Sequence, residues 1–407
     1  MKKRYITTTA ALMLLTAAMT YCITLYSAER DYNSKLMDLS AREQEYAKIA
    51  EVRSYIDKYY VNEYSEQDIT DGAVTGMVSF LGDKWSHYLT AEQFKSVQNS
   101  INNKTVGIGI NATYDEKNGA MVVLSVFDGS PAEYAGIKPN DKIVSVDGVS
   151  VSSIGFDSAV NKIKGAVGTP VSVGILHEGA DKAVTLSITR REIDIESVHA
   201  RILDGNIGYI EITNFDANTD GDFRAALENL KKANVKGIIF DVRNNPGGLL
   251  QVLVNVLDPL LPEGVIISEE DKSGEKKMYS SDANELNLPM AVLINEYSIS
   301  AAEFFAAALQ ESGKATLVGE ATTGKGCAQS QIKLSDGSGL VLSVSKYYTG
   351  RGTSLEDTHG IKPDREVKFT DDEKSRFYLL TDAQDRQLQT AIAVINEKTA
   401  GQKASAS

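Results

Sequence analysis

Cysteine and histidine are scarce in this chain of 407 residues. The two cysteines are Cys22, inside an apolar N-terminal stretch, and Cys327, so we do not expect them to pair, and the fold has to hold without a disulfide. No histidine lies near Cys327 in the sequence, which favours a small buried side chain there over a nucleophile. None of the four histidines falls in a segment that looks like the partner of a catalytic triad. They are His87, His177, His199 and His359.

Positive charge is also in deficit, and only one long apolar run is present. The formal net charge of −13 argues against nucleic acid or an anionic membrane surface as a partner. The apolar run, Tyr5 to Tyr26, follows Lys2-Lys3-Arg4 and is long enough to cross a bilayer as a helix. It is either a signal peptide or an anchor, and the poor cleavage site at Tyr26-Ser27-Ala28 favours an anchor over residues 1–28. The basic residues then keep the N-terminus cytoplasmic, which predicts a single-pass protein of the cell membrane with its remaining chain on the extracytoplasmic side.

The stretch from Met290 to Gln329 carries the strongest chemical signal. A short apolar run from Met290 to Glu296 predicts a buried strand, and Ala301 to Gln310 is rich in helix formers, so Ser300 falls where a strand passes into a helix. Unpaired amides at that helix N-terminus would favour an oxyanion beside the hydroxyl. Ser300 and Glu303 also fit a capping box, a purely structural alternative.

A second strand at Ala315 to Val318 leads into a loop that holds Lys325 between two glycines. The spacing from Gly319 to Lys325 imitates a phosphate-binding loop, but Gly326 replaces the Ser or Thr that would hold magnesium. The residues that follow, Ala328 to Leu334, alternate like a strand, whereas a phosphate-binding loop requires a helix. Nucleotide binding is therefore disfavoured, and no cofactor or metal is expected.

Two motifs together, Asn295-x-x-Ser298-x-Ser300-Ala-x-Glu303 and Gly324-Lys325-Gly326-x-x-Gln329, resemble the carboxyl-terminal processing proteases, also called tail-specific proteases. The resemblance extends from about Tyr46 to Val367. It implies a crotonase-like αβ serine protease core in which Ser300 is the nucleophile, Lys325 the general base and Gln329 the residue that orients the lysine. It also links Glu303, Glu311 and Thr322 to the support of the site.

Asp241-x-Arg243-Asn244-x-Pro246-Gly247-Gly248 begins in a predicted buried strand, Gly237 to Val242, continues into the turn after it, and matches the same family. The resemblance implies that this glycine pair lines the oxyanion hole, with the amide of Ala301 as the second donor. Bare amides can approach an oxyanion only where no side chain intervenes. A plain Pro-Gly turn is the structural alternative.

Residues 103–191 contain many short strands, frequent glycines and one clear helix, and their order resembles a PDZ domain. Gly107-Ile108-Gly109-Ile110 stands where that family binds a peptide carboxylate. Amides around glycines form an anion-binding nest, and the adjacent sheet edge can accept a peptide as an extra strand.

Residues 29–102 read as helical, with two apolar stripes that predict ordinary packing helices, and the family resemblance places some such helices at dimer contacts, so a homodimer is left open. The stripes are Ile49, Val52, Ile56, Tyr59 and Tyr60, and Ile69, Ala73, Met77 and Phe80. Trp85 and His87 occupy a segment that in the family more often reads Asp-Pro-Tyr-Ser, and we assign them no chemistry.

We therefore predict a multidomain protein of mixed α+β and α/β class. Its parts are the anchor or signal peptide (1–28), a helical region (29–102), a PDZ domain (103–191), a protease core (192–380), and a C-terminal helix with a disordered tail (381–407). The predicted function is a serine endopeptidase that cleaves exported proteins or peptides near a free C-terminus, with the PDZ domain binding that terminus, gating the site, or both. Lys325 would need a pKa about three units below that of a free lysine, a cost of roughly 4 kcal/mol to the charged form that burial would supply.

Two alternatives remain at this point. One is a membrane-tethered PDZ scaffold without turnover. The other is a Ser-Lys hydrolase of cell-wall or small-molecule amides, although Ser300 is followed by Glu303 where penicillin-binding proteins carry the lysine of Ser-x-x-Lys.

Overall fold

The computed structural model describes residues 44, 46–101, 104–115, 118–127, 129–194 and 196–406. The chain divides into two compact units, Met1–Ala73 and Val74–Ser407. The predicted anchor, residues 1–28, lies outside the described residues. Among the helices of the described part, none combines the length and apolar character that crossing a membrane demands.

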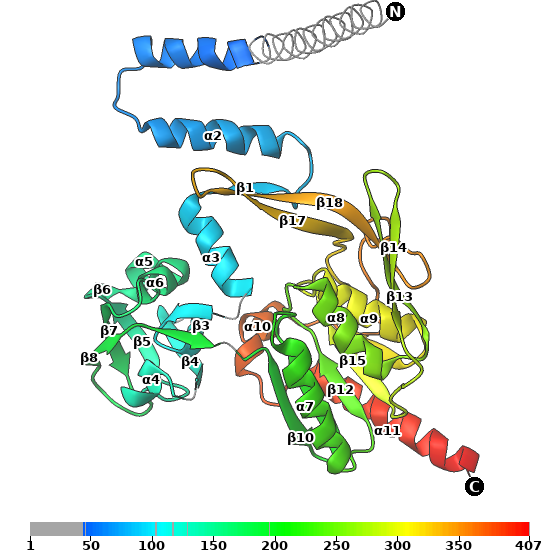
Figure 1. Cartoon of the computed structure of the whole chain (residues 1–407). Coiled ribbons are helices and arrows are strands. Elements are labelled where there is room, and N and C mark those ends of the chain that lie inside the picture. Colours follow the sequence, from blue (N-terminus) through cyan, green and yellow to red (C-terminus); the bar gives the residue numbers. More distant parts are fainter. Residues whose placement is uncertain are drawn as a thin grey trace, which may run out of the picture. The chain divides into compact units, whose positions relative to one another are not determined.

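The N-terminal segment is helical over residues 46–59 and again in α2 (Glu66–Ser79) (Figure 1). Both predicted apolar stripes are largely exposed, with Tyr59 65% and Phe80 94% exposed. The prediction that these are ordinary packing helices stays a prediction.

The PDZ segment forms a six-stranded antiparallel sheet in the order β3-β4-β5-β7-β8, with β6 paired to β5. The strands are β3 (Ile110–Asp115), β4 (Ala120–Val126), β5 (Lys142–Val146), β6 (Val149–Ser150), β7 (Pro170–Leu176) and β8 (Val184–Thr189). Helices α4 (Pro131–Tyr134), α5 (Val151–Ile154) and α6 (Phe156–Ile163) contribute to a core with fully buried Val123, Ile143 and Val173. The ends of the segment meet in a two-stranded ladder of β2 (Lys104–Gly107) and β9 (Arg191–Asp194).

A second six-stranded sheet, in the order β10-β11-β12-β15-β16-β19, contains the strands that precede Ser300 and Lys325. Its strands are β10 (Val198–Leu203), β11 (Ile207–Ile212), β12 (Ile238–Asp241), β15 (Met290–Ile294), β16 (Ala315–Gly319) and β19 (Arg365–Glu366). All of its pairs are parallel except β10 with β11. Strand β12 is buried on both faces, since Ile238 and Phe240 join one core cluster and Ile239 joins the other.

Helices cover both faces of this sheet, as its apolar strands require. Helices α7 (Thr219–Lys232), α8 (Leu250–Leu257) and α9 (Ala301–Glu311) share one core cluster with it. On the other face lies α11 (Arg386–Ala406), which contributes Leu388, Ala391 and Ile395. The same helix includes residues 401–406, so the prediction of a disordered tail is wrong for these residues. They include helix formers such as Gln402, Lys403 and Ala404.

A five-stranded sheet lies beside this core (Figure 1). It contains β1 (His87–Leu89), β13 (Gly264–Asp271), β14 (Lys276–Ser281), β17 (Cys327–Lys333) and β18 (Gly339–Thr349). Strand β1 corrects the helical prediction for this part of residues 29–102. It exists because β18 supplies an antiparallel partner, a long-range contact that local pattern does not reveal. Helix α3 (Ala91–Ile101) follows, and Phe94 packs where Gly339 leaves room for its ring.

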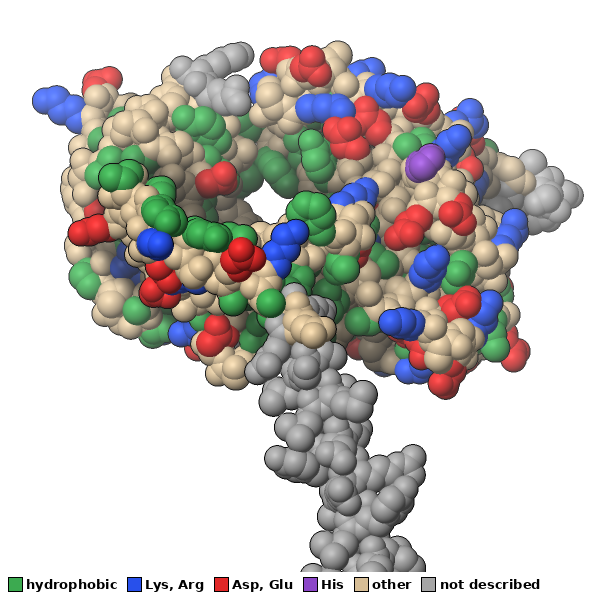
Figure 2. Space-filling view, turned by 90° about the horizontal axis from the view of Figure 1, so that it is seen from above, with side chains coloured by type: hydrophobic (Ala, Val, Ile, Leu, Met, Phe, Trp, Pro, Cys, Tyr) green, Lys and Arg blue, Asp and Glu red, His purple; other side chains and the backbone are tan. Residues whose placement is uncertain are grey.

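Short helices complete the chain: η1 (Asp258–Leu260), α10 (Asp371–Ser375) and η2 (Phe377–Leu379). On the face shown in Figure 2, acidic and basic side chains are interspersed, so the net negative charge is not gathered there into one patch.

Candidate active site

Ser300 occupies a strained turn between β15 and α9. Its backbone has φ 56° and ψ −114°, a conformation that costs a non-glycine residue roughly 1–3 kcal/mol. Ala301 begins the helix, so Ser300 lies at the helix N-terminus as predicted. Such strain in a half-exposed serine is typical of functional sites, where the surrounding structure maintains it.

The motif residues before Ser300 hold this turn against the loop that follows β12. The Ser298 hydroxyl donates to the carbonyl of Val242 at 2.8 Å. The side chain of Asn295 accepts from the amide of Asn244 at 3.0 Å and donates to its side-chain oxygen at 2.8 Å. Asn295 and Ser298 therefore fix the position of the serine turn against the loop 242–248.

The two glycines of that loop lie against backbone that a side chain would displace. A Cβ on Gly247 would come within 2.8 Å of the Ile299 carbonyl oxygen and 2.9 Å of the Ser300 Cβ. A Cβ on Gly248 would come within 2.0 Å of the Phe215 carbonyl oxygen. Both glycines have positive φ, 100° and 144°, so glycine is required on two counts.

The amides predicted for the oxyanion hole differ in whether their N–H group already donates a hydrogen bond within the protein. The amide of Gly247 donates to the side-chain oxygen of Asn245 at 2.8 Å, and the Asn245 carbonyl in turn accepts from Ile299 at 2.9 Å. Gly247 adjoins Ser300, but its N–H is occupied in this structure. Of the three amides predicted to line the oxyanion hole, those of Gly248 and Ala301 therefore remain available to donate to an oxyanion.

Glu303 links the serine turn to the lysine loop. Its side chain is fully buried, and one carboxylate oxygen, Oε2, accepts from the amides of both Ser300 and Lys325 at 2.8 Å. The other oxygen accepts from the Thr322 hydroxyl at 2.5 Å and the Gly324 amide at 2.6 Å. Burial raises the pKa of Glu303, while these hydrogen bonds oppose the rise. The capping contact that we had weighed as purely structural therefore also brings the two predicted catalytic segments together.

The Lys325 side chain meets Gln329 and Trp85. Its Nζ donates to Gln329 Oε1, and it lies 4.9 Å from the centroid of the Trp85 ring. Gln329 Nε2 donates to the Trp85 carbonyl at 2.5 Å. Burial lowers the pKa of Lys325, against the opposing influence of Cys327, Asp83 and Glu303, in the direction that a general base requires.

Of the other two residues predicted to support the site, Thr322 lies beside Glu303 and Glu311 lies away from it. Thr322 joins the Glu303 network and also accepts from the amide of Ile361 at 2.8 Å. Glu311 lies at the other end of α9 from Ser300, where it accepts from the Thr349 hydroxyl at 2.6 Å and the Arg351 amide at 3.1 Å. It anchors the end of β18 and does not reach the site.

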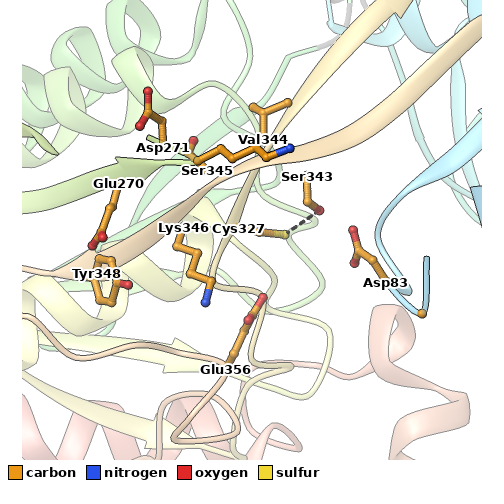
Figure 3. Close-up of a pocket in the computed structure, with 12 residues that line it drawn as sticks. Asp83, Glu270, Asp271, Cys327, Ser343, Val344, Ser345, Lys346, Tyr348 and Glu356 are labelled. Atoms are coloured by element: carbon orange, nitrogen blue, oxygen red, sulfur yellow. Dashed lines mark hydrogen bonds between the residues drawn. The ribbon is translucent and has the colours of Figure 1, made fainter. Parts of the chain in front are cut away.

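A cavity of about 600 Å³ borders the lysine loop on the Cys327 side (Figure 3). Its lining carries more carboxylates than amines, with Asp83 and Glu356 beside Cys327. Burial raises the pKa of the Cys327 thiol, and the Ser343 hydroxyl lies 3.3 Å from its sulfur. Both features agree with a packed, unreactive thiol.

In the PDZ segment, Gly107 to Ile110 line a groove of about 250 Å³ against α6. The opposite wall includes Phe156, Val160 and Ile163, so the groove is mainly apolar. Strand β3 is at the end of its sheet order and, among the residues that the structure describes, pairs with β4 alone, which leaves its outer edge for a further strand.

Sequence reasoning missed Trp85, which contacts both Lys325 and Gln329 from 244 positions before Gln329. The only available signal was the aromatic residue that the family pattern Asp-Pro-Tyr-Ser also carries at this place. It missed Asn245 as well, whose side chain accepts from the Gly247 amide two residues later and is oriented by its hydrogen bond to the distant Ile212 carbonyl.

Three protein-family models match parts of this chain. The family model for peptidase family S41 matches residues 206–367, a PDZ domain model matches 96–176, and a model of the activating protease CtpB N-terminal domain matches 13–93. The carboxy-terminal processing protease CtpA of Bacillus subtilis is 34% identical over 362 residues, which cover 88% of this chain and 77% of the relative.

Two further relatives are similar. CtpB of the same organism is 34% identical over 82% of this chain and 70% of its own length. The photosystem II D1 C-terminal processing protease, a solved structure, is 30% identical over 82% of this chain and 91% of its own, with a TM-score of 0.48. The chain thus belongs to the carboxyl-terminal processing proteases of peptidase family S41, which are serine peptidases, and it carries a PDZ domain.

Proposed function

We propose that this protein is an endopeptidase that cleaves exported proteins or peptides near their C-termini, with Ser300 as nucleophile, Lys325 as general base and Gln329 as the residue that orients the lysine. The observation that carries the proposal is the shared use of one Glu303 oxygen by the amides of Ser300 and Lys325. A partly buried amine with a lowered pKa, on the loop that this carboxylate holds to the serine turn, supports the role of Lys325 as a base.

In this mechanism the neutral Lys325 amine takes the proton of the Ser300 hydroxyl as the oxygen attacks a peptide carbonyl. The oxyanion is held by the amides of Gly248 and Ala301, together with Gly247 if Asn245 releases its amide. Lys325 then returns its proton to the leaving amine, and water releases the acyl group from Ser300 by the same steps. Gln329 accepts a hydrogen bond from the amine without the full charge that an aspartate would place beside it, so it orients the base without raising the pKa strongly.

The test is cleavage of an unstructured peptide by the full chain and by Ser300→Ala and Lys325→Met variants. Each substitution should lower kcat/KM by at least about 10³-fold because each removes a group that acts in the transition state. Thermal unfolding of each variant serves as the control for folding. A Ser300→Ala protein that is as active as the parent would disprove the proposal.

We further propose that the PDZ groove captures the free carboxyl terminus of the substrate. The amides around Gly107 and Gly109 suit an anion, and the free edge of β3 suits an extended peptide. Amidation of the peptide's last carboxylate should therefore raise KM while leaving kcat nearly unchanged. Equal kinetics for the acid and the amide would argue against capture at this groove.

The location and assembly of the protein also remain proposals. We propose a single-pass anchor at residues 1–28 that places the catalytic part outside the cell membrane, from the apolar run and its basic flank. A homodimer would cover the exposed apolar stripes of residues 46–59 and α2. The proposed PDZ domain extends over residues 103–191 and the proposed protease core over residues 192–380.

A PDZ scaffold without turnover is less well supported. It would leave unexplained why a strained serine, a lysine with a lowered pKa and its glutamine partner are all retained around Glu303.

A further inference from the structure

The turn that carries Trp85 is held rigidly on the five-stranded sheet. The Asp83 carboxylate accepts from the Trp85 amide at 3.0 Å and from the Ser86 hydroxyl at 2.5 Å. The Ser86 hydroxyl oxygen accepts from the amide of Ser343 on β18 at 3.0 Å, and β1 then pairs with the same strand. The position of Trp85 is therefore set by β18, the neighbour of the strand that carries Gln329.

From this position Trp85 makes two different contacts with the proposed site. Its carbonyl accepts from Gln329 Nε2 at 2.5 Å, and the Nδ1 atom of His87 lies 2.9 Å from the same oxygen. Its ring centroid lies 4.9 Å from Lys325 Nζ and 4.5 Å from Lys84 Nζ, both within the range of a cation–π contact.

The carbonyl contact determines which end of the Gln329 amide faces the lysine. A backbone carbonyl can only accept a hydrogen bond, so it binds the NH₂ group of the side chain. The oxygen of Gln329 is then the atom that points to Lys325 Nζ, as its hydrogen bond requires. Without this contact the amide could turn over and present a donor to the amine.

The ring contact acts on the charge of the lysine. The face of an indole ring attracts a cation, so it favours the protonated amine. The charged or titratable groups beside Lys325 are Asp83 from the same turn, Glu303 from α9 and Cys327 from β17, all of which favour the cation, whereas burial disfavours it. The ring thus adds to the groups that favour the protonated form of Lys325, against the burial that favours the neutral amine, and the mechanism requires this amine to take up and release a proton.

We propose that Trp85 is a positioning residue of the Ser300–Lys325 site: its carbonyl fixes the Gln329 amide, and its ring stabilises the Lys325 cation. The proposal rests on the function proposed above. Trp85 lies outside the matched S41 segment 206–367, so the site is complete only with a residue from the chain that precedes the PDZ domain.

The first test is the pH profile of kcat/KM for Trp85→Leu, which retains apolar bulk and the backbone carbonyl but has no ring. The acidic limb, which reports loss of the proton from Lys325, should move to lower pH by about half a unit to one unit. Trp85→Tyr should restore most of the parent position because it returns an aromatic face. Phe80→Leu, at an aromatic residue that is 94% exposed, is the matched control and should not move the limb.

The second test does not need activity. Trp85 is the only tryptophan of the chain, so indole fluorescence reports on the ring that both Lys325 and Lys84 approach. In the Ser300→Ala protein, the emission should titrate with a midpoint below the ordinary pKa of lysine. Lys325→Met in the same background should abolish that step, and Lys84→Met should leave it in place. A titration that persists in the Lys325→Met protein, or its absence from the Ser300→Ala protein, would overturn the ring contact.

The two tests separate the two proposals. If fluorescence titrates with Lys325 but the Ser300→Ala enzyme remains active, the contact is real and the catalytic assignment fails. If Trp85→Leu and Trp85→Tyr lose activity equally with no shift of the acidic limb, Trp85 serves the fold alone and this inference fails.

Discussion

Four hydrogen bonds converge on the carboxylate of Glu303, and they make this residue the centre of the site's geometry. Each oxygen receives two donors, and three of the four donors are backbone amides that have no freedom to turn. A neutral amide side chain of the same shape cannot replace it, since in either orientation its NH₂ group would face at least one backbone N–H, which can only donate.

Glu303→Gln should therefore lower kcat at least tenfold and also lower Tm, because buried donors left unpaired cost about 1–3 kcal/mol each. Glu311→Gln on the same helix is the matched control, since Glu311 also accepts two hydrogen bonds but lies away from Ser300. It should lower Tm while kcat of the folded enzyme stays within about twofold of the parent. Steady-state kinetics and thermal unfolding of both variants measure the difference, and equal kcat values would show that Glu303 only caps the helix.

At the scale of elements, the turn after β12 and the turn after β15 form one unit. Asn295 and Ser298 form hydrogen bonds with the loop 242–248, and Gly247 lies against the Ser300 Cβ. A displacement of either turn should therefore reach the other, since backbone contacts of this kind have little room to relax.

Gly247→Ala should lower kcat at least tenfold, because its new Cβ would press on the Ile299 carbonyl and on Ser300. The matched control is Gly274→Ala in the β13–β14 hairpin, where φ is also positive, 84°, but no atom lies within 4 Å of the new Cβ. Both variants bear a strain of about 1 kcal/mol, so the excess loss in Gly247→Ala measures the contact with the serine turn. Kinetics that are unchanged in both variants would contradict this coupling.

At the scale of the whole molecule, a buried charge network joins the parallel sheet to α11 and the turn before it. Arg243 donates to Asp241 on β12 and at 2.8 Å to Asp385, and its Nη1 donates to Gln387 of α11 at 3.0 Å. Glu211 is the register neighbour of Asp241 on β11, and burial, followed by the Asp241 carboxylate, raises the pKa of Glu211 to about 7.

This shift predicts how stability depends on pH. The folded protein holds the Glu211 proton more tightly than the unfolded chain. The protonated carboxyl therefore makes its full contribution to the free energy of unfolding below pH 4.5, and this contribution is lost as the pH rises to about 7. Glu211→Gln removes the titration and should raise the free energy of unfolding at pH 8 by up to about 3 kcal/mol, with little change near pH 4.5. Denaturant unfolding at the two pH values provides the measurement.

The control is Glu228→Gln on the exposed face of α7, where a hydrogen bond from Lys231 lowers the pKa of Glu228. That substitution should give no gain at pH 8. If the free energy of unfolding of Glu211→Gln at pH 8 equals that of the parent, the carboxyl group of Glu211 is exposed to water in solution and the prediction is contradicted.

Much of this protein follows from local pattern. The apolar runs around Ile238 and Met290 predicted buried strands, and the structure confirms β12 and β15. The helix formers after Ser300 predicted α9, and the glycines on either side of Lys325 predicted a loop. These features depend on neighbours a few residues away, which is why they can be read in order along the chain.

Other features arise only when distant segments meet. Strand β1 exists because β18 pairs with it, and Trp85 reaches Gln329 because that pairing places its turn there. The sequence thus determined the motifs and the type of each chemical group, whereas the tertiary structure decided which groups share a proton donor, an acceptor or a ring face, because hydrogen bonds and packing act through space over a few ångströms.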